Sequence, residues 1–148
     1  MLNAEDEALV SRACQVLKAT LQRGSVLNSP TAVKDYCRLN LATQPDEHFA
    51  GLFLDSQHRL LRGEVLFRGT VDAAAVYPRV VVRRALELNA AALIVAHNHP
   101  SGVAEPSPAD KQITTRLVEA LGLIDVRVLD HLVVTPDEIT SFAECGLL

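Results

Sequence analysis

A short apolar run at residues 90–96, which leads directly into His97, limits the folds that this chain can adopt. The run holds seven consecutive Ala, Leu, Ile and Val residues, far fewer than the roughly 20 needed to cross a bilayer. Apolar runs of this length without alternation are typical of a strand that is covered on both faces. We therefore expect a central strand in a sheet flanked by helices.

The remaining elements do not strictly alternate between helix and strand. Patterning predicts helices over residues 5–23 (stopped by Gly24), 29–41, 78–89 and 107–121, the last ended by Gly122, and strands over 47–55, 60–68, 90–97 and 126–135. Residues 100–106 are expected to be loop, and the pattern assigns no conformation to residues 136–148. This order predicts an α/β fold of the mixed α+β kind, with a mixed β-sheet flanked by helices.

The length of 148 residues is ordinary for one folding unit. We expect residues 1–44 to form a helical extension packed on the core of residues 45–148, because no linker separates them. The acidic first residues do not resemble a secretory signal. Three cysteines without C-x-x-C spacing predict free thiols, and together these features favour a cytoplasmic protein.

Composition also limits the partners that we expect. A net charge of −4 opposes a strongly basic nucleic-acid surface, because DNA affinity depends heavily on Lys and Arg that neutralise phosphates. No apolar run is long enough to span a membrane. A nucleic-acid partner is therefore disfavoured and a membrane partner is not expected.

Two histidines at the end of the central strand are the candidate metal ligands. His97 and His99 are two residues apart, so their side chains point to the same face if the strand continues that far. Zinc accepts imidazole nitrogen, and catalytic zinc sites commonly use three protein ligands with one position left for water. Asp110, in the first turn of the following helix, is the best candidate for the third ligand.

Helix capping offers a second interpretation of the same residues. Ser107-Pro108-Ala109-Asp110 has the N-cap, first-turn proline and first-turn acid of a sound helix start. Capping alone would explain Ser107 and Asp110, and short motifs often match by chance. Spacing by itself leaves both interpretations open.

A family resemblance adds to this interpretation. His97-Asn98-His99-Pro100, followed by Ser107-Pro108-Ala109-Asp110, resembles the H-x-H-P…S-x-x-D signature of JAB/MPN metalloproteases. With Phe67-Arg68-Gly69-Thr70 and Asp130-His131, residues 45–148 look like the RadC family in a short, single-domain form. The resemblance implies the MPN/JAB (cytidine deaminase-like) architecture.

The same resemblance implies the roles of the site residues. It implies Zn²⁺ held by His97, His99 and Asp110, with the Ser107 hydroxyl assisting the oxyanion. An upstream glutamate is implied as general acid and base. Glu47, just before an apolar strand, matches that context best, and Glu64 is the alternative.

The sequence therefore predicts a zinc-dependent hydrolase that uses an activated water on a peptide or isopeptide substrate. The first alternative is a catalytically silent, metal-stabilised interaction module, which could be associated with DNA repair. A second alternative is a nuclease, which the acidic charge and the single-metal ligand set oppose.

Overall fold

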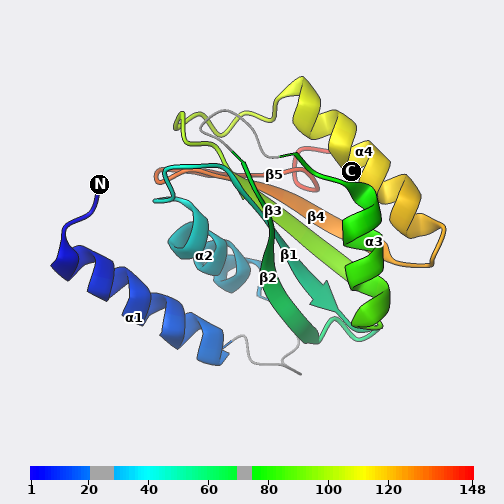
Figure 1. Cartoon of the computed structure of the whole chain (residues 1–148), viewed down its shortest axis with the longest axis horizontal. Coiled ribbons are helices and arrows are strands. Elements are labelled where there is room, and N and C mark those ends of the chain that lie inside the picture. Colours follow the sequence, from blue (N-terminus) through cyan, green and yellow to red (C-terminus); the bar gives the residue numbers. More distant parts are fainter. Residues whose placement is uncertain (21–28, 70–74) are drawn as a thin grey trace.

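Figure 1 shows the computed structural model of the chain, which describes residues 1–20, 29–69 and 75–148. Four helices and five strands form within these residues. The helices are α1 (Ala4–Thr20), α2 (Pro30–Leu41), α3 (Pro78–Glu87) and α4 (Pro108–Gly122). The strands are β1 (His48–Leu54), β2 (Leu60–Arg68), β3 (Ala92–Asn98), β4 (Arg127–Val134) and β5 (Ile139–Ser141).

The five strands form one mixed sheet in the order β2-β1-β3-β4-β5. Strands β3 and β4 run parallel, whereas the other neighbouring pairs are antiparallel. The apolar run of residues 90–96 falls mainly in β3, the middle strand, which confirms both the central strand and the mixed α/β fold predicted from the sequence.

Helices cover both faces of this sheet (Figure 1). One face packs against α2 through Val33, Cys37 and Leu41. The other face packs against α3 and α4 through a second cluster, in which Val81, Ala85, Leu117 and Leu121 meet the sheet residues Phe49, Phe53, Leu93 and Val95. Burying a large apolar side chain contributes about 1.5–3 kcal/mol, so the two clusters supply the main force that closes the three layers.

Alternation along β3 decides what lies on each face near its end. Leu93 and Val95 belong to the cluster under α3 and α4, whereas Ala92 and Ala96 belong to the cluster under α2. Successive side chains of a strand point to opposite faces, so His97 belongs with α4 and Asn98 with α2. This alternation places His97, and with it the candidate site, on the face of the sheet that α4 covers.

Glycines were expected to stop both α1 and α4. The expected stop of α1 at Gly24 lies outside the described residues, since α1 is described only to Thr20. Helix α4 was expected to end before Gly122, but that residue is still helical. Asp125, with a φ of 59°, instead reverses the chain, and Val126 N donates to Leu121 O at 2.9 Å.

The N-terminal helices differ in how they contact the core. Helix α2 packs directly on the sheet, whereas α1 packs against α2 (Figure 1). The division of the chain at residue 45 stays a prediction. No helix in residues 1–20, 29–69 or 75–148 combines the length and apolar character needed to span a membrane.

Candidate metal centre

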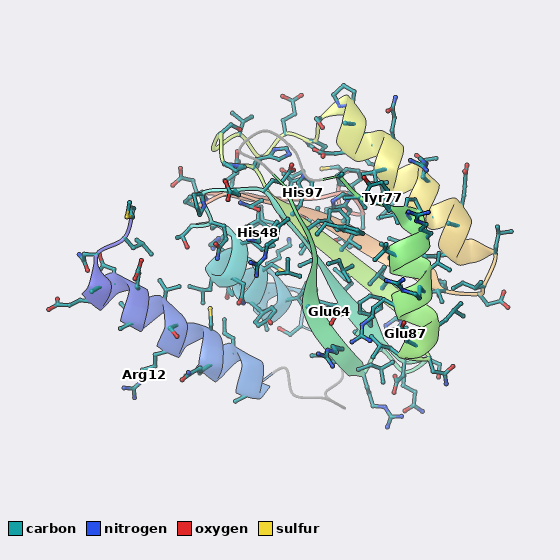
Figure 2. All side chains as sticks on the ribbon, viewed as in Figure 1. Arg12, His48, Glu64, Tyr77, Glu87 and His97 are labelled. Atoms are coloured by element: carbon teal, nitrogen blue, oxygen red, sulfur yellow. The ribbon has the colours of Figure 1, made fainter. Side chains whose placement is uncertain are left out.

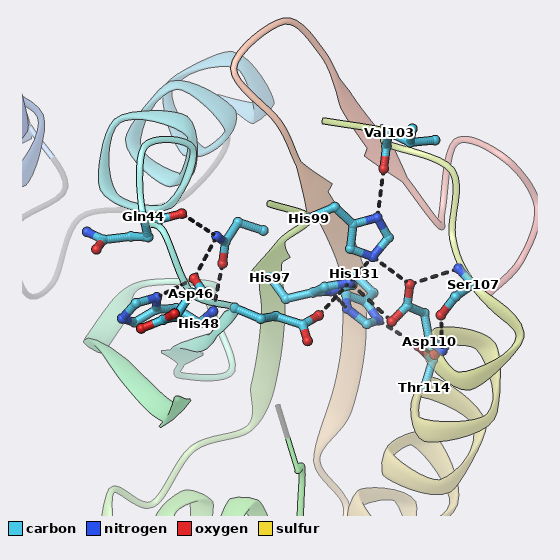
Figure 3. Close-up of polar contacts among 12 residues, drawn as sticks. Gln44, Asp46, His48, His97, His99, Val103, Ser107, Asp110, Thr114 and His131 are labelled. Atoms are coloured by element: carbon cyan, nitrogen blue, oxygen red, sulfur yellow. Dashed lines mark hydrogen bonds and ion pairs between the residues drawn. The ribbon is translucent and has the colours of Figure 1, made fainter. Parts of the chain in front are cut away.

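The candidate site forms where β3 ends against the start of α4. His97 is the next-to-last residue of β3 and is 2% exposed. His99 follows the strand, and its backbone N–H donates to Val134 O at 3.0 Å, which continues the pairing with β4. Asp110 lies in the first turn of α4, directly opposite the two imidazoles (Figure 3).

Nitrogen and oxygen atoms of these three residues converge closely. His97 Nε2 lies 2.9 Å from His99 Nε2 and 3.2 Å from Asp110 Oδ1. His99 Nε2 lies 2.9 Å from Asp110 Oδ2. Glu47 joins the group, because one potential ligand atom from each of the four residues lies within 4.8 Å of all the others.

The tautomer of His99 supports a cation at this point. Its Nδ1 lies 2.7 Å from Val103 O, and a carbonyl oxygen only accepts, so Nδ1 carries the hydrogen. In a neutral ring Nε2 then presents a lone pair to His97 and Asp110. Zinc ligands at about 2.0–2.2 Å in a tetrahedron lie roughly 3.3–3.6 Å apart, so this donor set fits zinc after shifts of a few tenths of an ångström.

Electrostatics keep Asp110 ionised in this enclosed position. Burial disfavours its charged form, but the contacts with the imidazoles of His97 and His99 outweigh burial and hold the pKa of the carboxyl well below its usual range. The contact with Asp110, which stabilises the protonated ring, correspondingly raises the pKa of His99 against the effect of its own burial. An ionised carboxylate is the form that a divalent cation requires.

Helix capping orients the same carboxylate. Ser107 N donates to Asp110 Oδ2 at 2.8 Å, and Asp110 N donates to Ser107 Oγ at 3.0 Å, which completes a capping box. The two interpretations of these residues are therefore compatible, because the cap turns Asp110 toward the histidines. Ser107 and His99 also line an open depression of about 420 Å³ formed by the loop before α4.

Glu47 lies immediately before β1 and is 9% exposed. Its Oε1 is 3.8 Å from His97 Nε2, and its backbone carbonyl accepts a hydrogen bond from Gly69 N at 2.8 Å. Asn98 holds both neighbours of Glu47: its amide accepts from His48 N at 2.7 Å and donates to Asp46 O at 3.0 Å. The backbone carrying Glu47 is thus tied to β3.

The alternative glutamate, Glu64, lies elsewhere on the sheet. It sits on β2 opposite Gly51 and forms ion pairs with Arg84 and, at 3.2 Å, with Arg62. Figure 2 shows Glu64 well down the sheet from His97. Of the two candidates, only Glu47 lies within the cluster.

Sequence reasoning missed a buried pair behind His97. His131 Nε2 lies 2.7 Å from His97 Nδ1, and His131 Nδ1 lies 2.6 Å from Thr114 Oγ1 (Figure 3). Burial, together with the nearby His97, lowers the pKa of His131 well below its usual value, so this ring is neutral. The neighbouring carboxylate of Asp130 instead accepts hydrogen bonds from Ser141 Oγ and Ala143 N.

A family model described as the RadC-like JAB domain matches residues 27–147, and these residues include the whole cluster. The chain belongs to the RadC-like JAB family. This confirms the resemblance noted from His97-Asn98-His99-Pro100 and the Ser107 to Asp110 segment. The JAB domain therefore carries a cluster of His, Asp and Glu side chains that could hold a metal ion.

Curated relatives of this JAB domain carry the name UPF0758 protein. The relative from Methylibium petroleiphilum is 60% identical over 145 residues, which are 98% of this chain and 65% of the relative. The relative from Chromohalobacter salexigens is 61% identical over 132 residues, which are 89% of this chain and 59% of the relative. The chain thus spans about three fifths of the length of these relatives.

Proposed function

We propose that this JAB domain is a zinc-dependent hydrolase that cleaves an amide bond of a peptide or isopeptide substrate. The convergence of His97, His99 and Asp110, with atoms 2.9–3.2 Å apart, carries this proposal. Two imidazole nitrogens and one carboxylate oxygen are a donor set typical of catalytic zinc. His97, His99 and Asp110 are the proposed ligands.

When bound here, zinc would supply the Lewis acidity that makes a water molecule nucleophilic near neutral pH and polarises a carbonyl. Glu47 is the proposed general base, which accepts a proton from the attacking water and returns it to the leaving nitrogen. Its carboxylate is nearly enclosed, and its Oε1 stands 3.8 Å from His97 Nε2. That distance is longer than the 2.9–3.2 Å between the proposed ligands, which favours a base beside the metal over a fourth ligand.

Ser107 is the proposed donor to the oxyanion that forms during hydrolysis. Its Oγ accepts from Asp110 N, and its own hydroxyl hydrogen is available for donation. The depression of about 420 Å³ that Ser107 and His99 line is open to solvent. An extended peptide or a side-chain amide can therefore reach the cluster from this side.

Zinc content of the purified, reconstituted and dialysed protein tests the proposal. We expect about one zinc per chain in the parent, as in other mononuclear zinc sites, and none in His97→Ala/His99→Ala. The matched control is His48→Ala/His58→Asn, which removes two histidines outside the cluster and should retain zinc. A parent that binds no zinc, or a His97/His99 variant that keeps it, contradicts the proposal.

A further inference from the structure

Behind His97 lies a continuous line of buried polar contacts that joins three elements. His97 Nδ1 meets His131 Nε2 at 2.7 Å, and His131 Nδ1 meets Thr114 Oγ1 at 2.6 Å. Thr114 Oγ1 in turn lies 2.6 Å from Asp110 O. His131 on β4 is fully buried and Thr114 on α4 is 3% exposed, so water does not compete for these contacts.

The direction of each hydrogen bond follows from the atoms present. Asp110 O can only accept, so Thr114 gives its single hydroxyl hydrogen to that carbonyl. The Thr114 oxygen must then accept at its other short contact, which requires hydrogen on His131 Nδ1. His131 is therefore assigned as the Nδ1–H tautomer.

The tautomer of His131 determines which ring nitrogen of His97 carries hydrogen. Its ring packs against those of Phe49 and Phe142, with centroids 5.6 and 4.6 Å away, an apolar setting in which a charged imidazole would be strongly disfavoured. The neutral Nε2 then carries a lone pair and accepts from His97 Nδ1. His97 Nε2 is left with its lone pair directed at His99 and Asp110.

We propose that Thr114 and His131 are positioning residues, which fix the tautomer and ring orientation of His97 so that its Nε2 binds the metal. The Thr114 hydroxyl also donates to the backbone carbonyl of Asp110. One oxygen atom therefore acts on Asp110 directly and on His97 through His131. This inference rests on the proposed zinc site and deepens it. Groups that orient ligand histidines typically contribute about 10–100-fold to metal affinity.

Zinc affinity of Thr114→Val, Thr114→Ser and the parent, measured by competition with a chromophoric chelator, tests this role. Valine keeps the shape of threonine but removes the hydroxyl, so we expect zinc affinity to fall about 10–100-fold. Serine keeps the hydroxyl and should restore most of that affinity. The matched control is Thr115→Val, because Thr115 Oγ1 bonds to Lys111 O at 3.0 Å on the exposed side of α4 and should not affect zinc.

The outcomes separate this inference from the zinc site itself. If the parent binds zinc and Thr114→Val binds it as tightly, the positioning role is wrong and the zinc site stands. A parent without zinc contradicts the site, and the positioning role with it. Equal losses in Thr114→Val and Thr115→Val would indicate a general effect of altering α4 and would also overturn the inference.

A spectroscopic measurement on the unaltered chain avoids any dependence on variants that fold. Long-range ¹⁵N–¹H correlation spectra distinguish the two neutral tautomers of each imidazole. We expect His131 to appear as a neutral ring with hydrogen on Nδ1. Hydrogen on Nε2 of a neutral His131 would overturn the proposal.

Discussion

The side chain of Asn98 holds the backbone of His48, whose N–H donates to Asn98 Oδ1 at 2.7 Å. Asn98 Nδ2 donates to Asp46 O at 3.0 Å, so one amide bridges both neighbours of Glu47. Asn98 stands between His97 and His99 in the sequence but points to the opposite face of β3. The same short segment therefore carries two proposed ligands on one face and the brace for the proposed base on the other.

Replacing Asn98 with alanine should destabilise the protein and displace Glu47. The change leaves the backbone N–H of His48 without its partner and removes one of two hydrogen bonds to Asp46 O, which still accepts from His48 Nδ1 at 2.9 Å. An unsatisfied buried group costs about 1–3 kcal/mol, so the free energy of unfolding, measured with urea, should fall by about this amount. Zinc content should stay unchanged, because no proposed ligand is removed.

The control for this variant is Asn40→Ala on α2. Asn40 Nδ2 donates to Tyr36 O at 2.8 Å within its own helix, so it braces no distant segment. Its loss should change the unfolding free energy by no more than about 0.5 kcal/mol. If Asn98→Ala is as stable as Asn40→Ala, the brace has no energetic importance.

Glu47→Gln should abolish amide hydrolysis while leaving zinc in place. Loss of a general base typically lowers turnover by about 10²–10⁴-fold, and glutamine keeps the size of the side chain. Turnover and zinc content are measured on the same sample. A fall in zinc affinity would instead make Glu47 a fourth ligand, and the site would then be closed and structural.

Glu64→Gln is the matched control for that change. It weakens the ion pairs that Glu64 forms with Arg84 on α3 and with Arg62 on β2, outside the cluster. Because such partly exposed pairs contribute only about 0–1 kcal/mol, stability should change little, and both zinc content and hydrolysis should match the parent. Lost hydrolysis in Glu64→Gln alone would transfer the role of base to Glu64.

Local patterns sufficed to predict most of the fold. The apolar run before His97 identified the central strand, and Pro30, Pro78 and Pro108 marked the starts of three helices. Strand β5 escaped prediction because its three residues carry little pattern of their own. It forms through pairing with β4, in which Leu132 lies opposite Ser141.

The supports of the candidate site could not be predicted, because they depend on how distant strands align. Adjacent residues of a strand point to opposite faces, so only one of Asp130 and His131 can approach His97. The β3–β4 register, with Val95 opposite His131, decides in favour of His131. Sequence alone contains no comparable information on this register or on the approach of Thr114 from α4.

Ser107→Ala should reduce both hydrolysis and stability, since Ser107 serves as N-cap of α4 and as the proposed oxyanion donor. Loss of the cap should cost about 1 kcal/mol. Loss of an oxyanion donor should lower turnover by about 10²–10³-fold. Stability is measured by urea unfolding and turnover on an amide substrate.

Ser107→Gly separates the two roles of Ser107. Glycine at an N-cap costs only a few tenths of a kcal/mol, yet it also lacks the hydroxyl. We expect turnover as low as in Ser107→Ala with stability close to that of the parent. Full turnover in Ser107→Gly would restrict Ser107 to capping.

Stability should decline at alkaline pH because of Cys37, a free thiol in the core cluster under α2. Burial raises the pKa of Cys37 to about 12, against about 8.5 in an unfolded chain. Because the pKa is higher in the folded state, the full stability is present below about pH 8.5, where the thiol is protonated in both states. The free energy of unfolding then falls progressively toward pH 12, by about 1.4 kcal/mol per pH unit.

Between about pH 8 and pH 10, the free energy of unfolding, measured with urea, should therefore fall by about 2 kcal/mol more in the parent than in Cys37→Ala, which lacks the thiol. The alanine variant starts from a lower stability because it leaves a small cavity, so the comparison concerns the change with pH and not the absolute value. Cys145→Ala, which removes an exposed thiol, should follow the parent. Parallel pH dependence in the parent and Cys37→Ala would show that Cys37 ionises as readily in the folded protein as in the unfolded chain.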